Sequence, residues 1–388
     1  MFRSGTTLLA RLLHTHEDIV CASDPYRPFF NCLRDSVATE LGVEVEPYDP
    51  LDSYYADEEQ LRLFDAVQSI TLDRPFDRDR ETLLTRIRSH GRQFSPRIIE
   101  NLEGAPGNTF EAIYRNLLSK VPEHYGCGDE QWLATKEVWA TEFVPALART
   151  FPESQFVLLV RDPRAVAASN NVAEASKYPW TFLARQWRKI AILSWAYNRD
   201  PDLAGRVHIV RYEDLVQSPR ETATDICDFL DIELDERVLD PSNFVDGRGN
   251  QWLQNTSYDD GGASFNTDSV DKWREALDDR ETALLEQCCL PSMSRFGYDS
   301  QASAGLHIDD DLLLDPPVCR SEELADWITQ YYEHRSPTAV REELGSEQVR
   351  QRMLLCDDDI RERLDGKTVR SYFLDEGFFE TARDTFGD

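Results

Sequence analysis

Two short apolar runs near the middle of the chain carry the clearest pattern. Residues 155–160 read QFVLLV and residues 207–210 read VHIV, and each run leads into a polar loop and then a helical pattern. A short continuous apolar run is typical of a parallel strand that is buried on both faces. Strand, polar loop and helix, repeated twice, predict an α/β fold in which helices cover a parallel sheet.

Helical patterns dominate an earlier stretch of the chain. Residues 40–125 are acidic and interrupted by prolines, with helical patterns near 57–69, 78–91 and 108–120. We interpret this stretch as a helical insertion or lid within the α/β unit.

The character of the chain changes near its C-terminal end. The segment HIDDDLLLDPP at 307–317 reads as an acidic linker, and 320–388 carries short helical segments with exposed-looking aromatic residues. We therefore predict one domain over 1–300, followed over 301–388 by an acidic linker and a helical C-terminal extension.

The net charge of the chain bears on which molecules it can bind. The chain has 388 residues and a formal net charge of −30, without a run of basic residues that could follow a polyphosphate backbone, so nucleic acid is not expected as a partner. Only six of the 42 basic residues are lysine. We interpret the acidic surface as a halophilic adaptation, because high salt shortens the screening length and relieves self-repulsion. An arginine-favouring, GC-rich genome is the alternative.

The spacing of the cysteines and the length of the apolar runs indicate the cellular compartment of the protein. Eight cysteines are scattered without a CxxC pair or a histidine at ligand spacing, so no metal is expected and the thiols should be reduced. The sequence shows no apolar stretch of about 18 residues, the length of a membrane span, and no signal peptide. We expect a cytoplasmic protein with no membrane association evident in this chain.

The chain opens on a glycine turn that leads into a helix, RSGTTLL at 3–9. Gly5 lets backbone N–H groups point inward, the hydroxyls of Ser4, Thr6 and Thr7 add donors, and the helix adds its positive end. An anion-binding loop fits this pattern, and so does a helix start capped by threonine. The lysine of an ATP- or GTP-binding loop is missing before the Ser/Thr position, which disfavours a P-loop kinase.

A second motif, VRDPRAVAASN, begins at the end of the first apolar run. Arg161 closes that strand and Ser169 follows eight residues later, so both can face the sheet edge where α/β proteins bind ligands. An arginine there can offer a fork of donors to a phosphate. A surface ion pair between Arg161 and Asp162 is the alternative.

Together these motifs resemble the sulfotransferases that use 3′-phosphoadenosine 5′-phosphosulfate, and their style is nearest to the tyrosylprotein and Golgi-like branch. The motifs stand in family order: RSGTTLL at 3–9, FPESQFVLLVRDPRAVAAS at 151–169, IVRYEDLVQSPRETATDICDFLDI at 209–232, VDKWREAL at 270–277 and FGYD at 296–299. The resemblance implies a P-loop-like three-layer sandwich around a central parallel sheet. It also implies transfer of a sulfuryl group to a hydroxyl or amine of a small-molecule, carbohydrate or peptide acceptor, without a metal. A catalytically inactive nucleotide-binding homologue is the alternative.

The resemblance assigns a set of residues to the nucleotide. Those residues are Arg3, Ser4, Gly5, Thr6 and Thr7 for the 5′-phosphosulfate, with Arg3 near the bridging oxygen; Arg161 and Ser169 for the 3′-phosphate; Tyr212 beside the nucleotide; and Lys272, Trp273 and Arg274 as further contacts to the nucleotide.

The resemblance also implies two residues that act on the sulfuryl group and its leaving oxygen. Lys136, in WLATKEVW, would stabilise charge on the leaving oxygen. Ser257, sixteen residues before Trp273, would donate to the sulfuryl group. An ion pair of Lys136 with Glu137 or another acid is the alternative.

The general base is expected among three side chains. Asp24, three residues past Cys21, stands where the tyrosylprotein relatives have a glutamate, although aspartate is one methylene shorter. His14 and His16 are alternatives, but their place at a helix end suggests capping and packing.

The anion-binding loop of this family follows the first, central strand of the sheet. Here only Met1 and Phe2 precede Arg3. Because loss of a central strand leaves backbone groups unpaired, we expect that this strand is truncated and that the native protein is longer.

Overall fold

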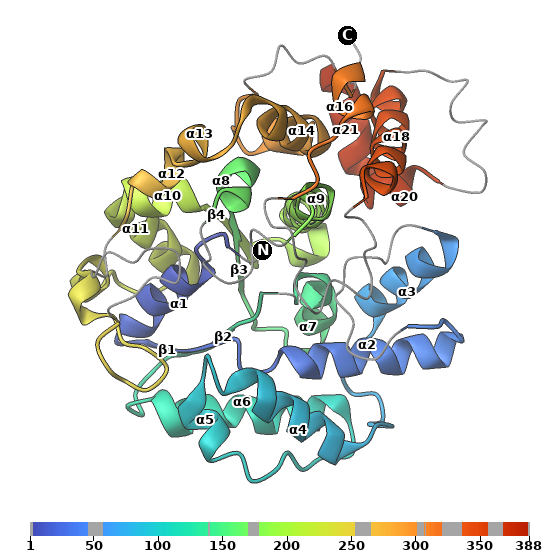
Figure 1. The fold of residues 1–388 in the computed structure, drawn as a ribbon. Coiled ribbons are helices and arrows are strands. Elements are labelled where there is room, and N and C mark those ends of the chain that lie inside the picture. The colour runs from blue at the N-terminus through green and yellow to red at the C-terminus, as the bar shows by residue number, and fades with distance from the viewer. Residues whose placement is uncertain are drawn as a thin grey trace.

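The computed structural model describes most of the chain (Figure 1). It describes residues 3–45, 57–138, 140–169, 178–252, 265–300, 306, 308–319, 336–355 and 368–386. Met1 and Phe2, on which the expectation of a truncated first strand rests, lie outside the described residues.

The described strands are all parallel and form two pairs. Strand β1 (Ile19–Ser23) pairs with β2 (Trp132–Lys136), and β3 (Phe156–Val160) pairs with β4 (Val207–Arg211). The predicted α/β fold with parallel strands is confirmed, and β3 and β4 match the two apolar runs. In place of the single central sheet that was predicted, the described residues give two sheets of two strands each.

Parallel pairing brings the carboxyl ends of the strands in each pair to the same edge. In the first pair Ser23 is opposite Lys136, so residue 24 and residue 137 leave the sheet side by side. In the second pair Val160 is opposite Arg211, so Arg161 and Tyr212 leave it together. These two edges position Asp24 and Glu137 after the first strand pair, and Arg161 and Tyr212 after the second.

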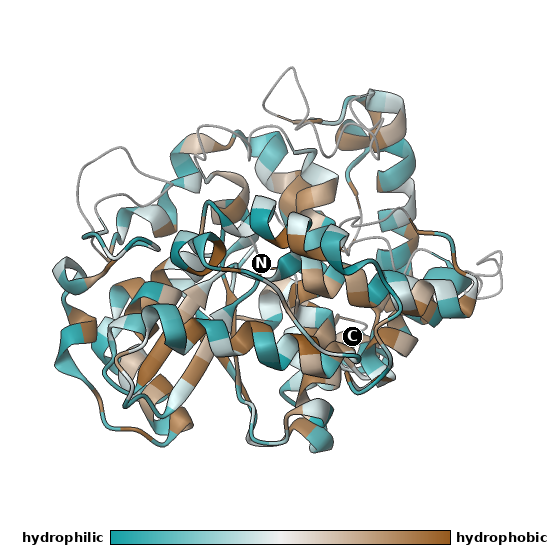
Figure 2. Cartoon of the chain, turned by 90° about the horizontal axis from the view of Figure 1, so that it is seen from below, coloured by the Kyte–Doolittle hydropathy of each residue, from teal (hydrophilic) through white to brown (hydrophobic). Residues whose placement is uncertain are grey.

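The helices of the core surround these strands. Their bounds are α1 Thr6–Thr15, α2 Arg27–Leu41, α7 Val144–Thr150, α8 Pro163–Ala167, α9 Trp180–Tyr197, α10 Tyr212–Gln217, α11 Pro219–Leu230, α12 Asp268–Asp271, α13 Trp273–Ala276, α14 Asp279–Cys289 and α15 Ser292–Arg295. Two buried apolar clusters result, one centred on α2, α9 and α14 and the other enclosed by α1, β1, β4 and α11. Apolar residues gather along the strands and on inward helix faces (Figure 2).

The predicted insertion is helical. It contains α3 (Glu58–Ser69), α4 (Arg80–Gly91), α5 (Pro96–Glu100) and α6 (Phe110–Tyr125), and α3, α4 and α6 match the three predicted helices. Each of those three helices has an N-cap side chain, Asp57, Asp79 or Thr109, that accepts a hydrogen bond from a backbone N–H of the first turn. Such an N–H has no acceptor within the helix, so the cap stabilises the helix start.

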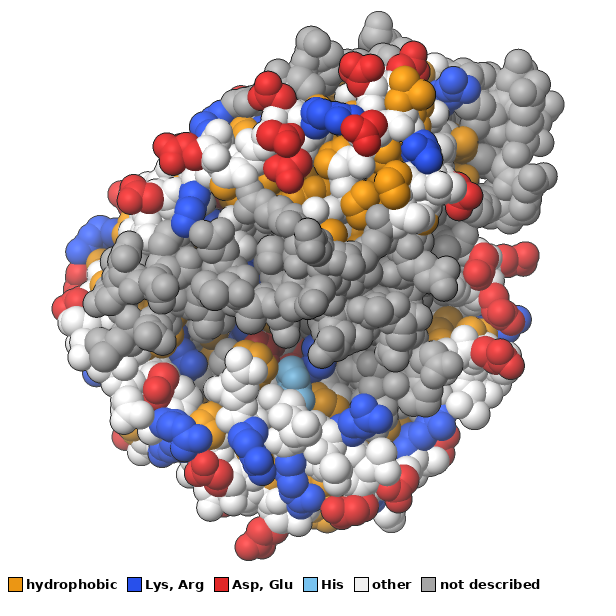
Figure 3. Space-filling view, viewed as in Figure 1, with side chains coloured by type: hydrophobic (Ala, Val, Ile, Leu, Met, Phe, Trp, Pro, Cys, Tyr) orange, Lys and Arg blue, Asp and Glu red, His pale blue; other side chains and the backbone are white. Residues whose placement is uncertain are grey.

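Basic side chains are prominent on this part of the surface. Figure 3 shows lysine and arginine side chains gathered over the region that α4 to α6 occupy in Figure 1. The strongly acidic composition therefore does not extend evenly over the molecule.

The C-terminal extension packs on the core. It contains α16 (Asp310–Leu314), α18 (Pro337–Leu354), α20 (Val369–Phe373) and α21 (Glu376–Phe386). Part of the predicted acidic linker is thus helical. The aromatic residues interpreted as exposed are largely buried, because Phe373 and Phe378 are 0% exposed and join the main apolar cluster.

A buried charge cluster fixes α18 to α9. Glu347 accepts hydrogen bonds from Arg188 on α9, at 2.7 and 2.8 Å, and from Arg350 one turn further along α18, at 2.7 Å. Burial by itself would raise the pKa of Glu347, but the charges and hydrogen bonds of the two arginines outweigh it and lower the pKa to about 2. This cluster is one of the polar anchors of the extension, beside the ion pair of Arg370 with Asp65.

Replacing Glu347 by glutamine is expected to lower the free energy of unfolding by about 3 kcal/mol at pH 7. The folded-state pKa lies below the usual 4.5, so the contribution is complete above about pH 4.5 and is lost as the pH falls toward 2. Urea unfolding at several pH values measures it, with Glu343→Gln on the same helix as control. Equal losses for both variants would contradict the prediction.

Among the described residues, no helix combines the length and apolar character that a membrane crossing requires.

Candidate functional site

The loop before α1 has the geometry of an anion-binding turn. Gly5 is the N-cap of α1 with a left-handed φ of 88°, and no side chain caps the helix. The alternative in which a threonine caps this helix is therefore wrong: Thr6 and Thr7 belong to the first turn. Backbone N–H groups at the start of α1 have no partner within the helix, and the helix dipole favours negative charge there.

Tyr212, the first residue after β4, covers this loop. A side chain at Gly5 would overlap the Cδ2 and Cε2 atoms of the Tyr212 ring, so only glycine permits this approach. The Tyr212 hydroxyl shares a hydrogen bond of 2.7 Å with Ser269, and the Arg161 guanidinium stacks 4.2 Å from the ring centroid. The Tyr212 ring is thus held at its hydroxyl by Ser269 and on its face by Arg161.

Arg161 ties the second motif to the first. Its terminal nitrogens donate to the backbone carbonyls of Arg3, at 2.9 Å, and Ser269, at 2.7 Å, while its buried Nε has no protein partner. Arg3 Nε donates to the Ser169 hydroxyl at 2.9 Å. The alternative of an Arg161–Asp162 ion pair is wrong, because Asp162 pairs with Arg164 at 2.6 Å.

The structure therefore brings together most residues assigned to the nucleotide. Those that converge are Arg3, Ser4, Gly5, Thr6, Thr7, Arg161, Ser169 and Tyr212. The Ser4 hydroxyl is fully buried and has no hydrogen-bond partner. A buried hydroxyl without a partner is costly, so its position beside a helix N-terminus fits a bound anion.

Asp24 and Lys136, the predicted base and the predicted cation, meet at the carboxyl ends of β1 and β2: Asp24 directly follows β1, and Lys136 is the last residue of β2. The Asp24 N–H donates to the Lys136 carbonyl at 2.6 Å, and Val138 N–H donates to Asp24 Oδ1 at 3.0 Å. Lys136 Nζ forms an ion pair with Asp24 Oδ2. Lys136 is thus paired with Asp24, one of the acids that the alternative reading allowed, and not with Glu137.

Two further side chains border Asp24 and were not predicted. Glu137 Oε1 accepts the Tyr26 N–H at 2.7 Å; burial raises the pKa of Glu137 well above its usual value, and the charge of Asp24 adds to this. His90, at the end of α4, has a buried Nε2 without a partner. Burial lowers the pKa of His90 to about 4, the charge of Arg27 adds to this, and Asp24 opposes it.

The sequence could have indicated one of these two residues but not the other. Glu137 directly follows the predicted site residue Lys136, and this adjacency was the one feature of the sequence that pointed to it. His90 lies in the insertion, and the sequence contains no pattern that links α4 to β1. The structure links them through Ser95, whose hydroxyl donates to the Ser23 carbonyl at 2.8 Å.

The two histidines considered as alternative bases are in packing positions. His14 accepts the Cys21 N–H at 3.3 Å, stands edge-on to Tyr125, and has its pKa lowered to about 4, mainly by burial. His16 Nε2 lies 2.8 Å from the Glu233 carbonyl. Both positions match the interpretation of capping and packing.

The predicted nucleotide contacts Lys272, Trp273 and Arg274 lie at α12 and α13. Trp273 is 2% exposed. The guanidinium carbons of Arg164 and Arg274 lie 3.9 and 4.4 Å from the centroid of its ring. Arg274 is exposed and pairs with Asp271, and Lys272 is half-buried. Ser269 on α12, four residues before Trp273, contacts Tyr212 through its hydroxyl and Arg161 through its backbone carbonyl. Ser257 lies outside the described residues.

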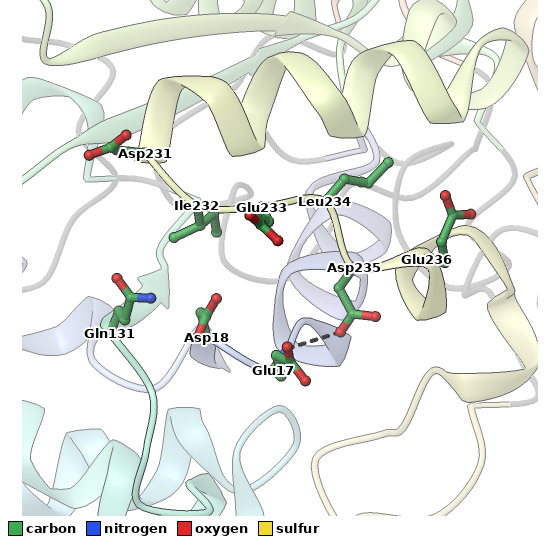
Figure 4. Close-up of a pocket in the computed structure, with 9 residues that line it drawn as sticks. All are labelled: Glu17, Asp18, Gln131, Asp231, Ile232, Glu233, Leu234, Asp235 and Glu236. Carbon is green, nitrogen blue, oxygen red and sulfur yellow. Dashed lines mark hydrogen bonds between the residues drawn. The ribbon is translucent and has the colours of Figure 1, made fainter.

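A pocket of about 450 Å³ lies at the opposite edge of the first strand pair. It is lined by Glu17, Asp18, Gln131, Asp231, Ile232, Glu233, Leu234, Asp235 and Glu236 (Figure 4). Asp18 and Gln131 precede β1 and β2, whereas Asp24 and Glu137 follow them. A wall of carboxylates repels a phosphosulfate, so this pocket does not belong to the nucleotide site. The described residues contain no group of three or more His, Cys, Asp and Glu side chains placed to hold a metal.

Comparison with known proteins identifies similar sequences. A family model described as the sulfotransferase family matches residues 1–236. A putative protein-tyrosine sulfotransferase of Caenorhabditis briggsae is 26% identical over 194 residues, which cover 46% of this chain and 66% of that protein. Human carbohydrate sulfotransferase 3 is 28% identical over 174 residues, or 37% of this chain and 33% of that protein. This chain thus spans between one third and two thirds of these two relatives.

One solved structure is similar over most of the chain. It is the sulfotransferase domain from the curacin biosynthetic pathway, with a TM-score of 0.45 and 18% identity, covering 77% of this chain and 95% of that domain.

Proposed function

Because this chain belongs to the sulfotransferase family, we propose that it transfers a sulfuryl group from 3′-phosphoadenosine 5′-phosphosulfate to a hydroxyl or amine of an acceptor. The observation that carries this proposal is the convergence of the loop at 3–7 with Arg161, Ser169 and Tyr212 around a helix N-terminus and an unpartnered buried hydroxyl. These groups suit an anion, and the Tyr212 ring lies so close to Gly5 that no side chain fits at that position.

The proposed roles of the nucleotide-site residues combine the family resemblance with the contacts of each side chain. The start of α1 and the Ser4 hydroxyl would hold the 5′-phosphosulfate, and Arg3, anchored to Ser169, would add charge at its bridging oxygen. Arg161 has two of its nitrogens committed to backbone carbonyls, so it acts first by fixing the loop and the Tyr212 ring. The nucleotide supplies the sulfuryl group and a phosphate leaving group when it is bound.

The transfer itself needs a base and a fixed positive charge. Asp24 would take the proton of the acceptor, the acceptor atom would bond to sulfur, and the bond from sulfur to the phosphate oxygen would break. Lys136 would stabilise the charge left on that oxygen. In-line positioning and preorganised charge are the sources of rate acceleration here.

The acceptor class follows from the relatives. They carry the names protein-tyrosine and carbohydrate sulfotransferase, so a tyrosine-bearing peptide or a carbohydrate is proposed as acceptor. The insertion from α3 to α6 borders Asp24 through His90 and Ser95, so with Asp24 as the base it would lie beside the acceptor's reacting atom. Incorporation of labelled sulfate into a tyrosine peptide and into an oligosaccharide panel separates the two classes.

Calorimetric titration with 3′-phosphoadenosine 5′-phosphate, beside ATP with Mg²⁺, tests the donor site. We expect micromolar affinity for the bisphosphate, weak or no binding of ATP, and a loss of about tenfold or more in Arg3→Ala. Arg220→Ala is the matched control, because Arg220 is exposed and pairs with Glu236 away from the loop.

Two results would contradict the proposal. Preferential binding of ATP with Mg²⁺ would indicate a nucleoside triphosphate enzyme. Tight binding of the bisphosphate without turnover on any acceptor would indicate an inactive nucleotide-binding homologue.

A further inference from the structure

The two groups that the proposed reaction needs at the sulfuryl centre are paired with each other. Lys136 Nζ contacts Asp24 Oδ2, and both side chains are mostly buried, 13% and 8% exposed. Asp24 Oδ1 accepts the Val138 N–H at 3.0 Å. Each carboxylate oxygen of the base thus already has a donor, and the cation already has a counter-ion.

This pairing hinders both roles. A carboxylate bonded to an ammonium group has its charge neutralised and fewer lone pairs available for an incoming proton. An ammonium bonded to a carboxylate offers less charge to a departing phosphate oxygen. Separation of the pair would therefore favour sulfuryl transfer.

Resting on the proposed function, we infer that Lys136 exchanges partners when the donor binds, moving from Asp24 to the phosphosulfate and so releasing the Asp24 carboxylate for the acceptor's proton. The proton then passes from the acceptor hydroxyl to Asp24 Oδ2 as the acceptor oxygen bonds to sulfur. The electron pair of the broken sulfur–oxygen bond stays on the phosphate, beside Lys136. The donor must bind before the base can act.

The backbone around the pair supports movement of the lysine side chain alone. Ser23 and Lys136 are register partners, the Asp24 N–H donates to the Lys136 carbonyl at 2.6 Å, and Tyr26 N–H donates to Glu137 at 2.7 Å. These bonds hold the two loops together independently of the ion pair. Lysine carries its charge on a flexible four-carbon stem, so its Nζ can change partner while the loops remain in place.

Affinity measurements on Asp24→Asn test the exchange without an acceptor. Without the ion pair, Lys136 no longer has to leave a partner, so 3′-phosphoadenosine 5′-phosphate should bind at least threefold more tightly. Adenosine 3′-phosphate, which lacks the 5′-phosphate, should bind as it does to the unaltered protein. Asparagine tolerates the left-handed φ of 46° at this position and can still accept the Val138 N–H, so the fold should be retained.

Two further variants separate the exchange from a general loss of negative charge. Asp18→Asn removes a carboxylate one residue before β1, as Asp24→Asn removes one directly after it, and should leave both affinities unchanged. In a Lys136→Met background, Asp24→Asn should change the bisphosphate affinity by less than twofold, because no partner remains to exchange.

The outcomes are distinguishable. An unchanged or weakened affinity in Asp24→Asn overturns the exchange, as does a gain that persists in the Lys136→Met background or appears equally in Asp18→Asn. If the unaltered, folded protein does not bind the bisphosphate at all, the proposed function fails and the exchange fails with it. Circular dichroism of each variant confirms folding.

Discussion

Gly5→Ala is expected to weaken the binding of 3′-phosphoadenosine 5′-phosphate by at least about 100-fold. The new methyl group would occupy the position of the Tyr212 ring, which cannot retreat because Ser269 holds its hydroxyl and Arg161 stacks on its face. Alanine also disfavours the φ of 88° by about 1–2 kcal/mol. The loop must therefore open, and calorimetric titration measures the affinity that remains.

Gly42→Ala is the matched control for this substitution. Gly42 also has a positive φ, 67°, but a side chain there would meet nothing within 4 Å. It should show the cost in conformational strain with no change in nucleotide affinity. If Gly5→Ala binds the bisphosphate normally, the loop at 3–7 is not the phosphosulfate site.

Lys136→Met is expected to lower the turnover number by about 100- to 1000-fold, the range observed when one fixed donor to a developing negative charge is removed. The substitution keeps the length of the side chain but removes the charge that would face the leaving oxygen. It also leaves Asp24 without its cation. Initial rates of sulfate transfer to a tyrosine peptide or an oligosaccharide at saturating donor measure the effect.

Lys120→Met is the control for Lys136→Met. Lys120 lies on α6 and pairs with the neighbouring Glu123, at 2.6 Å, outside the site. It should leave the turnover number unchanged. A loss of less than about tenfold in Lys136→Met would show that this lysine does not stabilise the leaving oxygen.

Local pattern was sufficient for the elements that carry the nucleotide motifs. Strands β3 and β4 were predicted because continuous apolar runs over 155–160 and 207–210 need no partner to be recognised. Strands β1 and β2 were not predicted. All four described strands have five residues, but β1 reads IVCAS and β2 reads WLATK. In each of these two sequences, two large apolar residues are followed by small or polar ones, so neither forms a continuous apolar run.

The roles of individual side chains were less predictable than their location. Arg161 was expected to present its donors to a phosphate, but two of its nitrogens bond to the carbonyls of Arg3 and Ser269. Trp273, which the resemblance assigned to the nucleotide, is buried and has the guanidinium group of Arg164 over its ring. In both cases the partner is distant in sequence, and no periodicity or spacing encodes which donor meets which acceptor.

The sequence by itself determined the α/β class, the glycine loop ahead of α1 and the order of the family motifs, because each depends on residues that are close together in the chain. Only the tertiary structure decided that Lys136 is paired with Asp24, that His90 and Glu137 border this pair, and that Ser269 holds Tyr212. These contacts depend on strand register and on the docking of the insertion, which arise when separate segments bury their apolar faces together.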